Sequence, residues 1–434
     1  MPTPPLTLFW FRRDLRLHDN KGLYYALKSA EPVLAVFIFD DDILEPLPED
    51  DHRVTFFYGL LKEMDRQLRK AGSGLLVKRG RPLQVFKELL EQYNVRSVYC
   101  NGDHEPYGQA RDQQLRQLLD EKGIPMLASI DHLVMEKNEV LKADGSPYLV
   151  FTPYSKQWKK QLTGKHLSHF ESESMIDRFY QDRVAAFPSL KKLGLSPSKM
   201  PMSEPDISEG LIRKYDQTRD FPGAEGTSRV GPHLRFGSIS IRELVKKARQ
   251  WNETYLNELI WREFYAMILW QFPRVVKEAF KPEYDRIAWR NDEAELERWK
   301  NGTTGYPMVD AGMRQLAQSG YMHNRLRMVT ASFLTKHLLT DWRWGEAWFA
   351  EKLFDYELSS NNGGWQWSAG TGTDAAPYFR IFNPMEQQKK FDPDKEFIKK
   401  WIPELETSKY PEPMVDHKMA RERCLETYKK GIGG

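Results

Sequence analysis

Val33-Leu34-Ala35-Val36-Phe37-Ile38-Phe39, followed directly by Asp40, is the longest unbroken apolar run of the chain. It is too short to cross a membrane, and a run of this length is typical of a strand buried on both faces of a parallel sheet. Similar runs alternate with longer segments of helical period. The strands are predicted at Thr7–Arg12, Val33–Asp40, Leu75–Arg79, Ser97–Asn101 and Pro125–Ile130, and the helices at Lys21–Ala30, Val54–Ala71, Pro82–Tyr93 and Gly108–Lys122. Since parallel strands need crossover connections, this alternation predicts an α/β domain with a doubly wound parallel five-stranded sheet over residues 1–133.

The second half of the chain has few strand signals. Amphipathic stretches punctuated by Pro and Gly take their place beyond residue 205, which predicts an all-α domain over residues 205–434. Residues 134–204 are rich in Pro, Ser, Gly and Lys, and we interpret them as a long interdomain connector on the surface. The predicted helices are Ile241–Gln250, Tyr255–Gln271, Glu293–Asn301, Met308–Ser319, His323–Leu339 and Trp344–Phe354.

The composition narrows the class of protein. Of 434 residues, 40% are hydrophobic and 29% charged, as in a globular chain rather than a disordered or membrane one. The net charge is only +3, so any affinity for a polyanion must come from the placement of charges. Cys100 and Cys424 lie outside any CxxC or Cys/His cluster, and the N-terminus lacks a secretory pattern. We therefore expect no metal site and a cytoplasmic location.

A glycine- and amide-rich stretch runs from Ser359 to Asp374 and holds Trp365 and Trp367. At this spacing the two indoles point to nearly opposite sides of a helix, so each is expected to face a different partner. Gly363 and Gly364 would let the backbone approach a flat ligand. A glycine-rich loop held by two core tryptophans explains the stretch about as well. Its GxGxxA pattern follows no strand, so a Rossmann site is rejected there.

The segment from His323 to Met328 brings amide, basic and thioether side chains together. On a helix Asn324 and Met328 share a face, whereas Arg325 and Arg327 diverge. One arginine would then meet a phosphate while the other pairs internally, and Asp355 is the candidate partner. A solvated basic face explains Arg325 almost as well.

Two further groups suit a planar, charged ligand. Glu258, Trp261, Arg262 and Tyr265 fall on one side of a helix, where an acid beside an indole suits a nucleic-acid base, although core packing is an equal alternative. Gly226–Arg229 offers hydroxyl and backbone N–H groups to a diphosphate, a weak signal by itself. No P-loop, HExxH, GxSxG or paired-carboxylate motif is present, so hydrolysis and phosphoryl transfer have no support.

Five stretches of the sequence, four of them described above, together resemble the signatures of the photolyase/cryptochrome flavoproteins. They are Trp10–Asn20 (WFRRDLRLHDN), Gly226–Arg229, Glu258–Tyr265, His323–Met328 and Asn361–Pro384. Within that family the chain is most similar to class I cyclobutane pyrimidine dimer (CPD) photolyases. The resemblance implies FAD in the helical domain, and light-driven electron transfer from reduced FAD to a dimer flipped out of DNA, which splits the dimer.

The resemblance also implies roles for individual residues. Catalytic residues would be Glu258, Asn361, Asn324 and Met328, and electron transfer would use Trp289, Trp342 and Trp365. FAD would be bound by Tyr215, Thr227, Ser228, Arg229, Val230, Gly231, Arg262, Arg327, Asp355, Tyr356, Glu357 and Asn361, with Arg327 and Asp355 as a buried pair. The dimer and DNA would contact Glu258, Trp261, Tyr265, Asn324, Arg325, Met328, Trp367, Arg380, Gln387 and Lys390.

Some positions depart from the family pattern. Glu357 stands where many relatives carry Asp, and Val230-Gly231 replaces Leu-Ser. Tyr107-Gly108 stands where pterin-binding members have Asn-Glu, so a second, antenna chromophore is of open identity or absent. Partners other than UV-damaged DNA are not expected.

The alternatives are a (6-4) photolyase and a blue-light-sensing cryptochrome without repair activity. Asn361 at the position facing flavin N5 is the photolyase choice, and His323-Asn324 lacks the second His that (6-4) repair would use as a proton donor. The chain also stops soon after the helical domain, which leaves no long signalling tail. CPD repair is therefore the favoured prediction.

Overall fold

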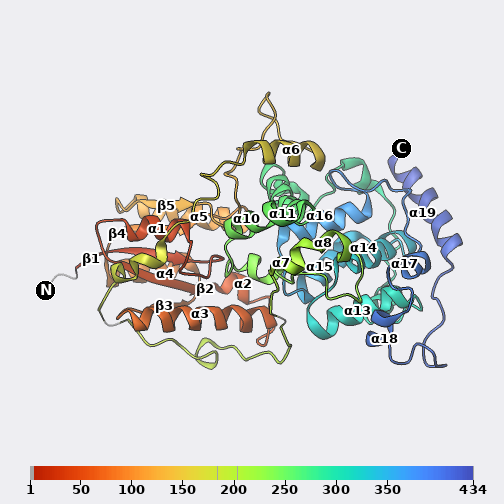
Figure 1. The fold of residues 1–434 in the computed structure, drawn as a ribbon, viewed down its shortest axis with the longest axis horizontal. Coiled ribbons are helices and arrows are strands. Elements are labelled where there is room, and N and C mark those ends of the chain that lie inside the picture. Colours follow the sequence, from red (N-terminus) through yellow and green to blue (C-terminus); the bar gives the residue numbers. More distant parts are fainter. Residues whose placement is uncertain (1–3, 183, 203, 434) are drawn as a thin grey trace. The chain divides into compact units, whose positions relative to one another are not determined.

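The computed structural model describes residues 4–182, 184–202 and 204–433 (Figure 1). The chain forms two compact units, which are described separately. The first comprises Met1–Glu139, Gln161–Lys199 and Val230–Lys247, and the second comprises Val140–Lys160, Met200–Arg229 and Ala248–Gly434. Among the described residues, none of the helices combines the length and apolarity that a membrane span requires.

A five-stranded parallel sheet forms the centre of the first unit, as predicted. Its strands β1 (Pro5–Phe11), β2 (Val33–Phe39), β3 (Leu75–Arg79), β4 (Asn94–Asn101) and β5 (Met126–Ser129) lie in the order β3-β2-β1-β4-β5. The strands β2 and β3 lie on one side of β1 and β4 and β5 on the other, so the sheet is doubly wound. The five predicted strands match within three residues at either end.

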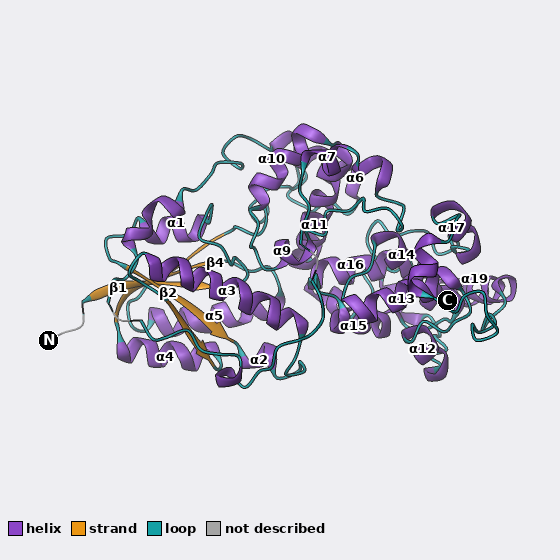
Figure 2. Cartoon of the chain, turned by 60° about the horizontal axis from the view of Figure 1, so that its bottom comes forward, coloured by secondary structure: helices purple, strands orange, loops and turns teal. Residues whose placement is uncertain are grey.

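Helices cover both faces of this sheet (Figure 2). Phe9 and Phe11 of β1 pack with α1 (Lys21–Leu27) and α3 (His52–Lys70) on one face. Leu8 and Trp10 pack with α4 (Pro82–Gln92) and α5 (Pro106–Asp120) on the other. Because successive side chains of a strand point to opposite faces, one apolar strand builds both halves of the core. The first unit also contains α2 (Asp41–Leu44), α9 (Gly231–Arg235), the start of α10 (Ile241–Trp251) and the short helices η1 (Ser172–Arg178) and η2 (Lys191–Leu193).

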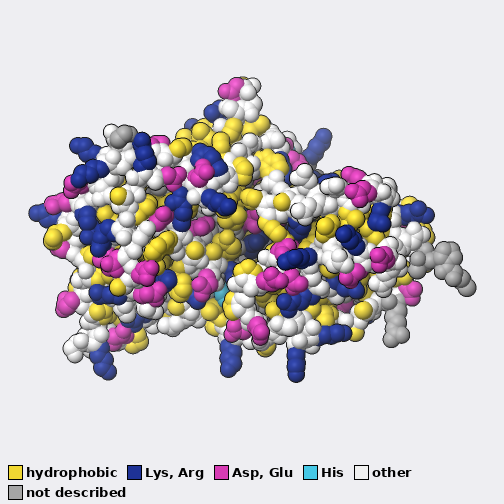
Figure 3. Space-filling model, turned by 180° about the vertical axis from the view of Figure 1, so that it is seen from behind, with side chains coloured by type: hydrophobic (Ala, Val, Ile, Leu, Met, Phe, Trp, Pro, Cys, Tyr) yellow, Lys and Arg dark blue, Asp and Glu magenta, His cyan; other side chains and the backbone are white. Residues whose placement is uncertain are grey.

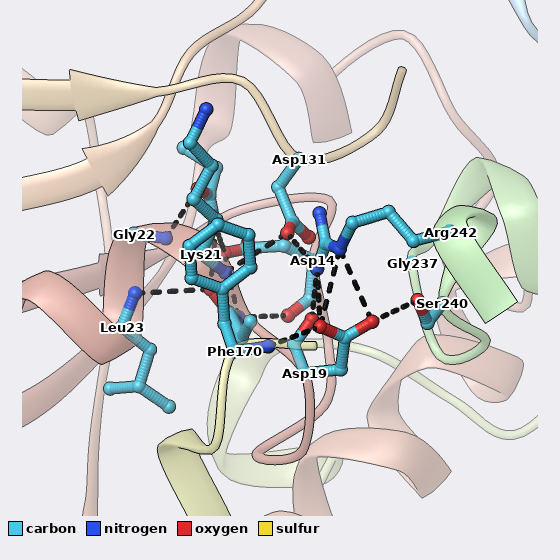
Figure 4. Close-up of polar contacts among 12 residues, drawn as sticks. Asp14, Asp19, Lys21, Gly22, Leu23, Asp131, Phe170, Gly237, Ser240 and Arg242 are labelled. Carbon is cyan, nitrogen blue, oxygen red and sulfur yellow. Dashed lines mark hydrogen bonds and ion pairs between the residues drawn. The ribbon is translucent and has the colours of Figure 1, made fainter. Parts of the chain in front are cut away.

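Polar residues of the signature Trp10–Asn20 belong to a buried network in this unit, and Figure 4 shows Asp14 and Asp19 within it. Arg16 donates to Asp131 at 2.6 Å, and Arg242 pairs with both Asp131 at 2.9 Å and Asp19 at 3.0 Å. Asn20 caps α1 by accepting from the backbone N–H of Leu23 at 3.1 Å. Two arginines therefore neutralise two buried aspartates, and this part of the signature stabilises the fold.

His169 and Glu243 lie beside Asp19, near enough together to suggest a cation site. The Asp19 carboxylate, however, already accepts hydrogen bonds from Ser240, Arg242 and the backbone of Phe170. A carboxylate neutralised by a guanidinium is a poor cation ligand, so we interpret the group as part of the ion-pair network.

Replacing Arg242 by alanine should lower the free energy of unfolding by about 3–5 kcal/mol, because it leaves Asp19 and Asp131 buried without this partner. Urea denaturation measures the change. Arg213→Ala is the control, since Arg213 pairs with Glu209 on the surface, at 2.7 Å, and surface pairs contribute less than about 1 kcal/mol. Equal losses in the two variants would contradict the assignment.

The second unit is helical in the part of the chain that the structure describes. Its core combines Trp299, Trp342, Trp365, Phe333 and Phe349, so core packing accounts for several of the chain's many aromatic residues. The helices are α6 (Phe151–Gln161), α7 (Glu209–Arg213), α8 (Tyr215–Thr218), the end of α10, α11 (Glu253–Gln271), η3 (Pro273–Val276), η4 (Pro282–Arg286), α12 (Glu293–Lys300), α13 (Pro307–Ser319), α14 (Asn324–Ser332), the π-helical turn η5 (Phe333–His337), α15 (Trp342–Lys352), α16 (Leu358–Ala369), α17 (Pro384–Phe391), α18 (Glu396–Trp401) and α19 (His417–Ile432).

Two segments differ from the sequence-based expectation. The predicted helix His323–Leu339 is divided into α14 and η5. The predicted connector contains α6, whose residues Tyr154 and Trp158 are buried. Propensity alone did not indicate α6, because its stability comes from packing on α11.

Candidate active site in the helical unit

The glycine-rich stretch folds as helix α16 and then as turns. Trp365 is buried, whereas Trp367 is only partly buried, so the two indoles lie in different surroundings, as their spacing predicts. The alternative of a loop is wrong for the first part of the stretch, which is helical from Leu358 to Ala369.

Close packing explains why a helix with two glycines forms here. A Cβ atom at Gly363 would lie 2.2 Å from the ring of Tyr265 on α11, and one at Gly345 on α15 would lie 2.1 Å from the ring of Trp365. These contacts stabilise α16 despite the low helix propensity of glycine. At Gly364, by contrast, a Cβ would meet nothing within 4 Å, so backbone is exposed to open space beside Trp365.

The four residues predicted on one side of α11 have distinct partners. Trp261 and Tyr265 lie with ring centres 5.4 Å apart. Arg262 donates to Glu357 at 2.9 Å, so the longer acid at position 357 reaches an arginine of α11. Both are members of the predicted FAD set.

Glu258 forms a short charged hydrogen bond with Arg219, a residue that the sequence analysis missed. Burial raises the pKa of the Glu258 carboxyl, and the guanidinium of Arg219 opposes this shift. Arg219 also lies 5.4 Å from the ring centre of Tyr215, but no local pattern indicated that it pairs with Glu258.

On α14 the two arginines diverge as predicted. Arg327 donates to Asp355 at 2.8 Å, and this ion pair is partly rather than fully buried, with side-chain exposures of 27% and 20%. Arg325 donates to Asp220 at 2.7 Å and lies 4.0 Å from the ring centre of Phe391. Arg325 is therefore not a freely solvated cation.

The predicted catalytic pair on the same helix is accessible. Asn324 is exposed and Met328 is partly buried, four residues further along the same face. Neither is enclosed in the core, so both side chains can meet a ligand.

The residues predicted to bind the diphosphate lie close together in part. Thr227 Oγ1 is 2.9 Å from the hydroxyl of Tyr321, and Tyr255 donates to Ser228 at 2.8 Å. The ring of Tyr215 packs edge-on against Tyr255, with centres 5.0 Å apart.

Arg229 has a left-handed backbone, with φ of 50°, and pairs with Glu225 at 2.6 Å. Val230 and Gly231 follow at the start of α9, and contacts assign them to the first unit.

Asn361 is buried on α16 and donates to the backbone oxygen of Glu346 at 3.0 Å. Glu346 is a second residue that the sequence analysis missed. Burial raises its pKa to about 7, while hydrogen bonds from Asn362 and Asn361 oppose the shift. The amide of Asn361 is thus held by α15, and an acid that is mostly protonated below pH 7 lies beside it. Tyr356, two residues before α16, is partly buried against the core.

The three tryptophans predicted to transfer electrons belong to one aromatic region, because Trp342 and Trp365 lie in the core of the helical unit and Trp289 packs against that core. The Trp365 ring lies against Gly345, which is one turn after Trp342 on α15. The segment after Trp289 is hydrogen-bonded to the segment before Trp342. The N–H of Arg290 donates to the carbonyl of Leu339 at 2.7 Å, and the N–H of Asp341 donates to the side chain of Asn291 at 2.8 Å. Trp365 and Trp342 are buried, whereas Trp289 is partly exposed.

Three of the residues predicted to contact DNA, Arg380, Gln387 and Lys390, lie on α17 or just before it in sequence. Lys390 and Arg325 both lie over the ring of Phe391, at 5.1 Å and 4.0 Å. Arg380 and Lys390 are exposed, and Gln387 is partly buried. Acidic and basic side chains are interspersed over the face drawn in Figure 3, in keeping with the low net charge.

Comparison with known proteins identifies the family. The family model of the FAD binding domain of DNA photolyase matches residues 255–409, and the DNA photolyase model matches residues 7–173. The chain belongs to the DNA photolyase family. The deoxyribodipyrimidine photo-lyase of Halobacterium salinarum is 36% identical over 99% of this chain and 100% of its own length, and that of Escherichia coli is 35% identical over 98% and 99%.

Solved structures of photolyases have the same fold. A class III photolyase from Agrobacterium tumefaciens aligns over 100% of this chain and 99% of its own, with a TM-score of 0.88 and 31% identity. An archaeal photolyase from Sulfolobus tokodaii, described with two FAD molecules, aligns over 98% and 100%, with a TM-score of 0.80 and 33% identity. The photolyase prediction is confirmed, and the finer class I assignment stays a prediction.

Some side chains of the helical unit suit FAD. Hydroxyls at Thr227 and Ser228 suit phosphate oxygens, and the backbone at Gly364 has no atom that a Cβ would meet within 4 Å. The Nε1 atom of Trp365 is buried and has no hydrogen-bond partner within the described residues. These features fit a photolyase that binds FAD.

Proposed function

We propose that this photolyase repairs cyclobutane pyrimidine dimers in DNA with light, using the side chains of α11, α14 and α16 around bound FAD. The observation that carries the proposal is the close contact of α11 with α16, through Tyr265 and Gly363, within the FAD-binding photolyase domain. Reduced FAD supplies the light absorption and the electron, and the residues of the chain orient the dimer.

On α11 the acid and the indole have separate roles. Glu258 hydrogen-bonds the pyrimidine edge of the dimer, where a carboxyl that can donate a proton stabilises developing charge. Trp261 packs against the flipped bases, and Tyr265 supports it. Trp367 on α16, and Asn324 with Met328 on α14, complete the pocket.

A second set of residues holds the cofactor. Tyr215, Thr227, Ser228, Arg229, Val230 and Gly231 bind the diphosphate and ribityl side, and Asn361 faces the flavin ring. The ion pairs of Arg327 with Asp355 and of Arg262 with Glu357 fix charges near it without leaving a lone buried charge. Trp365, Trp342 and Trp289 carry electrons to oxidised flavin and take no part in repair itself.

DNA is held by three basic side chains and one amide. Arg325, Arg380, Gln387 and Lys390 contact the DNA backbone, so we expect affinity to fall as salt rises. We also propose a cytoplasmic location and no obligate protein partner, and the two buried free cysteines are compatible with a reducing compartment.

A second chromophore, where one is bound, is not held by the Asn-Glu pair of pterin-binding members. The position of the glutamate is Gly108, where a Cβ would lie 2.8 Å from the side chain of Asp103. The neighbouring Tyr107 hydroxyl donates to Asp40 at 2.7 Å. Absorption spectra before and after denaturation test whether any chromophore other than FAD is present.

Illumination tests the activity directly. Purified protein with reduced FAD should convert dimers in an oligonucleotide to free pyrimidines in light and leave them unchanged in the dark. The conversion is measured by chromatography, with protein-free illuminated DNA as the control. Untouched dimers in lit samples whose spectra show bound FAD would favour a cryptochrome that signals without repair.

A further inference from the structure

Helix α6 lies antiparallel along α11, with contacts at regular four-residue steps on both helices. Lys159 pairs with Glu253 at 2.6 Å, and Ser155 lies 3.2 Å from Asn257. Four residues earlier on α6 and four residues later on α11, Phe151 stacks on Trp261, with ring centres 3.8 Å apart and planes 4° from parallel. Because four residues complete about one helical turn, Phe151 is placed against Trp261 by the whole length of α6.

The indole of Trp261 is enclosed by three aromatic rings. Phe151 covers one face, Phe264 meets it edge-on with centres 5.5 Å apart, and Tyr265 lies tilted at 5.4 Å. Trp261 nevertheless remains partly exposed. The ring plane is therefore fixed on one face, and its remaining surface is available to a ligand.

Phe151 is itself held by the segment that follows α16. Its backbone N–H donates to Asp374 at 3.0 Å, and Thr373 donates to the carbonyl of Leu149 at 2.5 Å. Asp374 adopts a left-handed φ of 47°, which is uncommon for a residue other than glycine. The start of α6 is thus bonded to the same chain segment that leads from Trp367.

We propose that Phe151 is a positioning residue for dimer recognition, which acts by holding the plane of Trp261. This inference rests on the proposed role of Trp261 as a wall of the lesion pocket. A face-to-face stack restrains the indole before DNA arrives, so less conformational freedom is lost when a flipped dimer packs against it.

The test compares binding of dimer-containing and undamaged DNA in the dark. Phe151→Ala should weaken binding to dimer-containing DNA by about three- to tenfold, the range expected from loss of an aromatic pair. Binding to undamaged DNA should stay unchanged, because its contacts lie elsewhere. Phe151→Tyr, which keeps the ring, should restore wild-type affinity, and Phe280→Ala, which removes the aromatic partner of Phe272, is the matched control.

A double variant distinguishes positioning from a general structural effect. In a Trp261→Ala background, Phe151→Ala should cause no further loss of affinity for the dimer, since it acts only through the indole. FAD absorbance confirms that each variant is folded. Phe151→Leu keeps apolar volume without a ring, so it should weaken binding to dimer-containing DNA as Phe151→Ala does.

Three outcomes would overturn the proposal. The first is tighter binding of the dimer by Phe151→Ala or Phe151→Leu. The second is an equal loss of affinity for damaged and undamaged DNA. The third is that Phe151→Ala weakens dimer binding as much in the Trp261→Ala background as in the wild type. The proposed function fails separately, if Trp261→Ala by itself leaves the preference for damaged DNA intact.

Discussion

Trp261→Ala is expected to weaken binding to dimer-containing DNA by about 5- to 150-fold, which corresponds to the 1–3 kcal/mol typical of one base stacked on an aromatic ring. Binding to undamaged DNA should change little, because an intact duplex keeps its bases stacked and does not reach the indole. Equilibrium titrations of both DNAs at one salt concentration measure the two affinities.

Trp348→Ala is the matched control for this variant. Trp348 lies on α15 beside Lys300 and Lys352, with their amines 4.9 Å and 4.5 Å from its ring centre. Its loss should leave both affinities unchanged. A Trp261→Ala protein that loses affinity for damaged and undamaged DNA in equal measure would show that Trp261 supports the fold and not the pocket.

Trp289→Phe should reduce photoreduction of oxidised FAD to a small fraction of the wild-type rate. A phenyl ring is harder to oxidise than an indole, and Trp289 is the partly exposed member of the three tryptophans that we propose carry electrons to the flavin. Repair by protein reduced chemically beforehand should proceed at the wild-type rate, because repair does not use this route.

Both rates can be followed in one sample, by flavin absorbance under illumination and by dimer conversion after reduction. Trp348→Phe controls for loss of an indole elsewhere on the helical unit. An unchanged photoreduction rate in Trp289→Phe would show that electrons reach the flavin by another path.

The parallel sheet was predictable because its signal is local. Each strand is an apolar run between helical segments, and burial on both faces dictates that composition. The spacing of Glu258, Trp261 and Tyr265 on α11 was equally readable, since helical period alone puts them on one side. Pairing of Arg327 with Asp355 followed from their charges and from the divergence of the two α14 arginines.

Other features could not be read from local patterns. Gly363 and Gly364 lower helix propensity, and α16 forms because Tyr265 fits where a side chain at position 363 would lie. Arg219 is distant from Glu258 in sequence, so only the fold reveals that the two are paired. Phe151 lies in a segment that composition assigned to a connector.

The sequence by itself determined the two classes of architecture, the family and the types of side chain available to bind FAD and a lesion. These depend on periodicity and on motif residues, which neighbouring positions in the chain encode. Tertiary structure alone decided which residues hold those side chains in place: Arg219 on Glu258, Glu346 beside Asn361, and Phe151 on Trp261. The physical reason is that close packing and buried charge pairing act between residues far apart in sequence, where no local pattern records them.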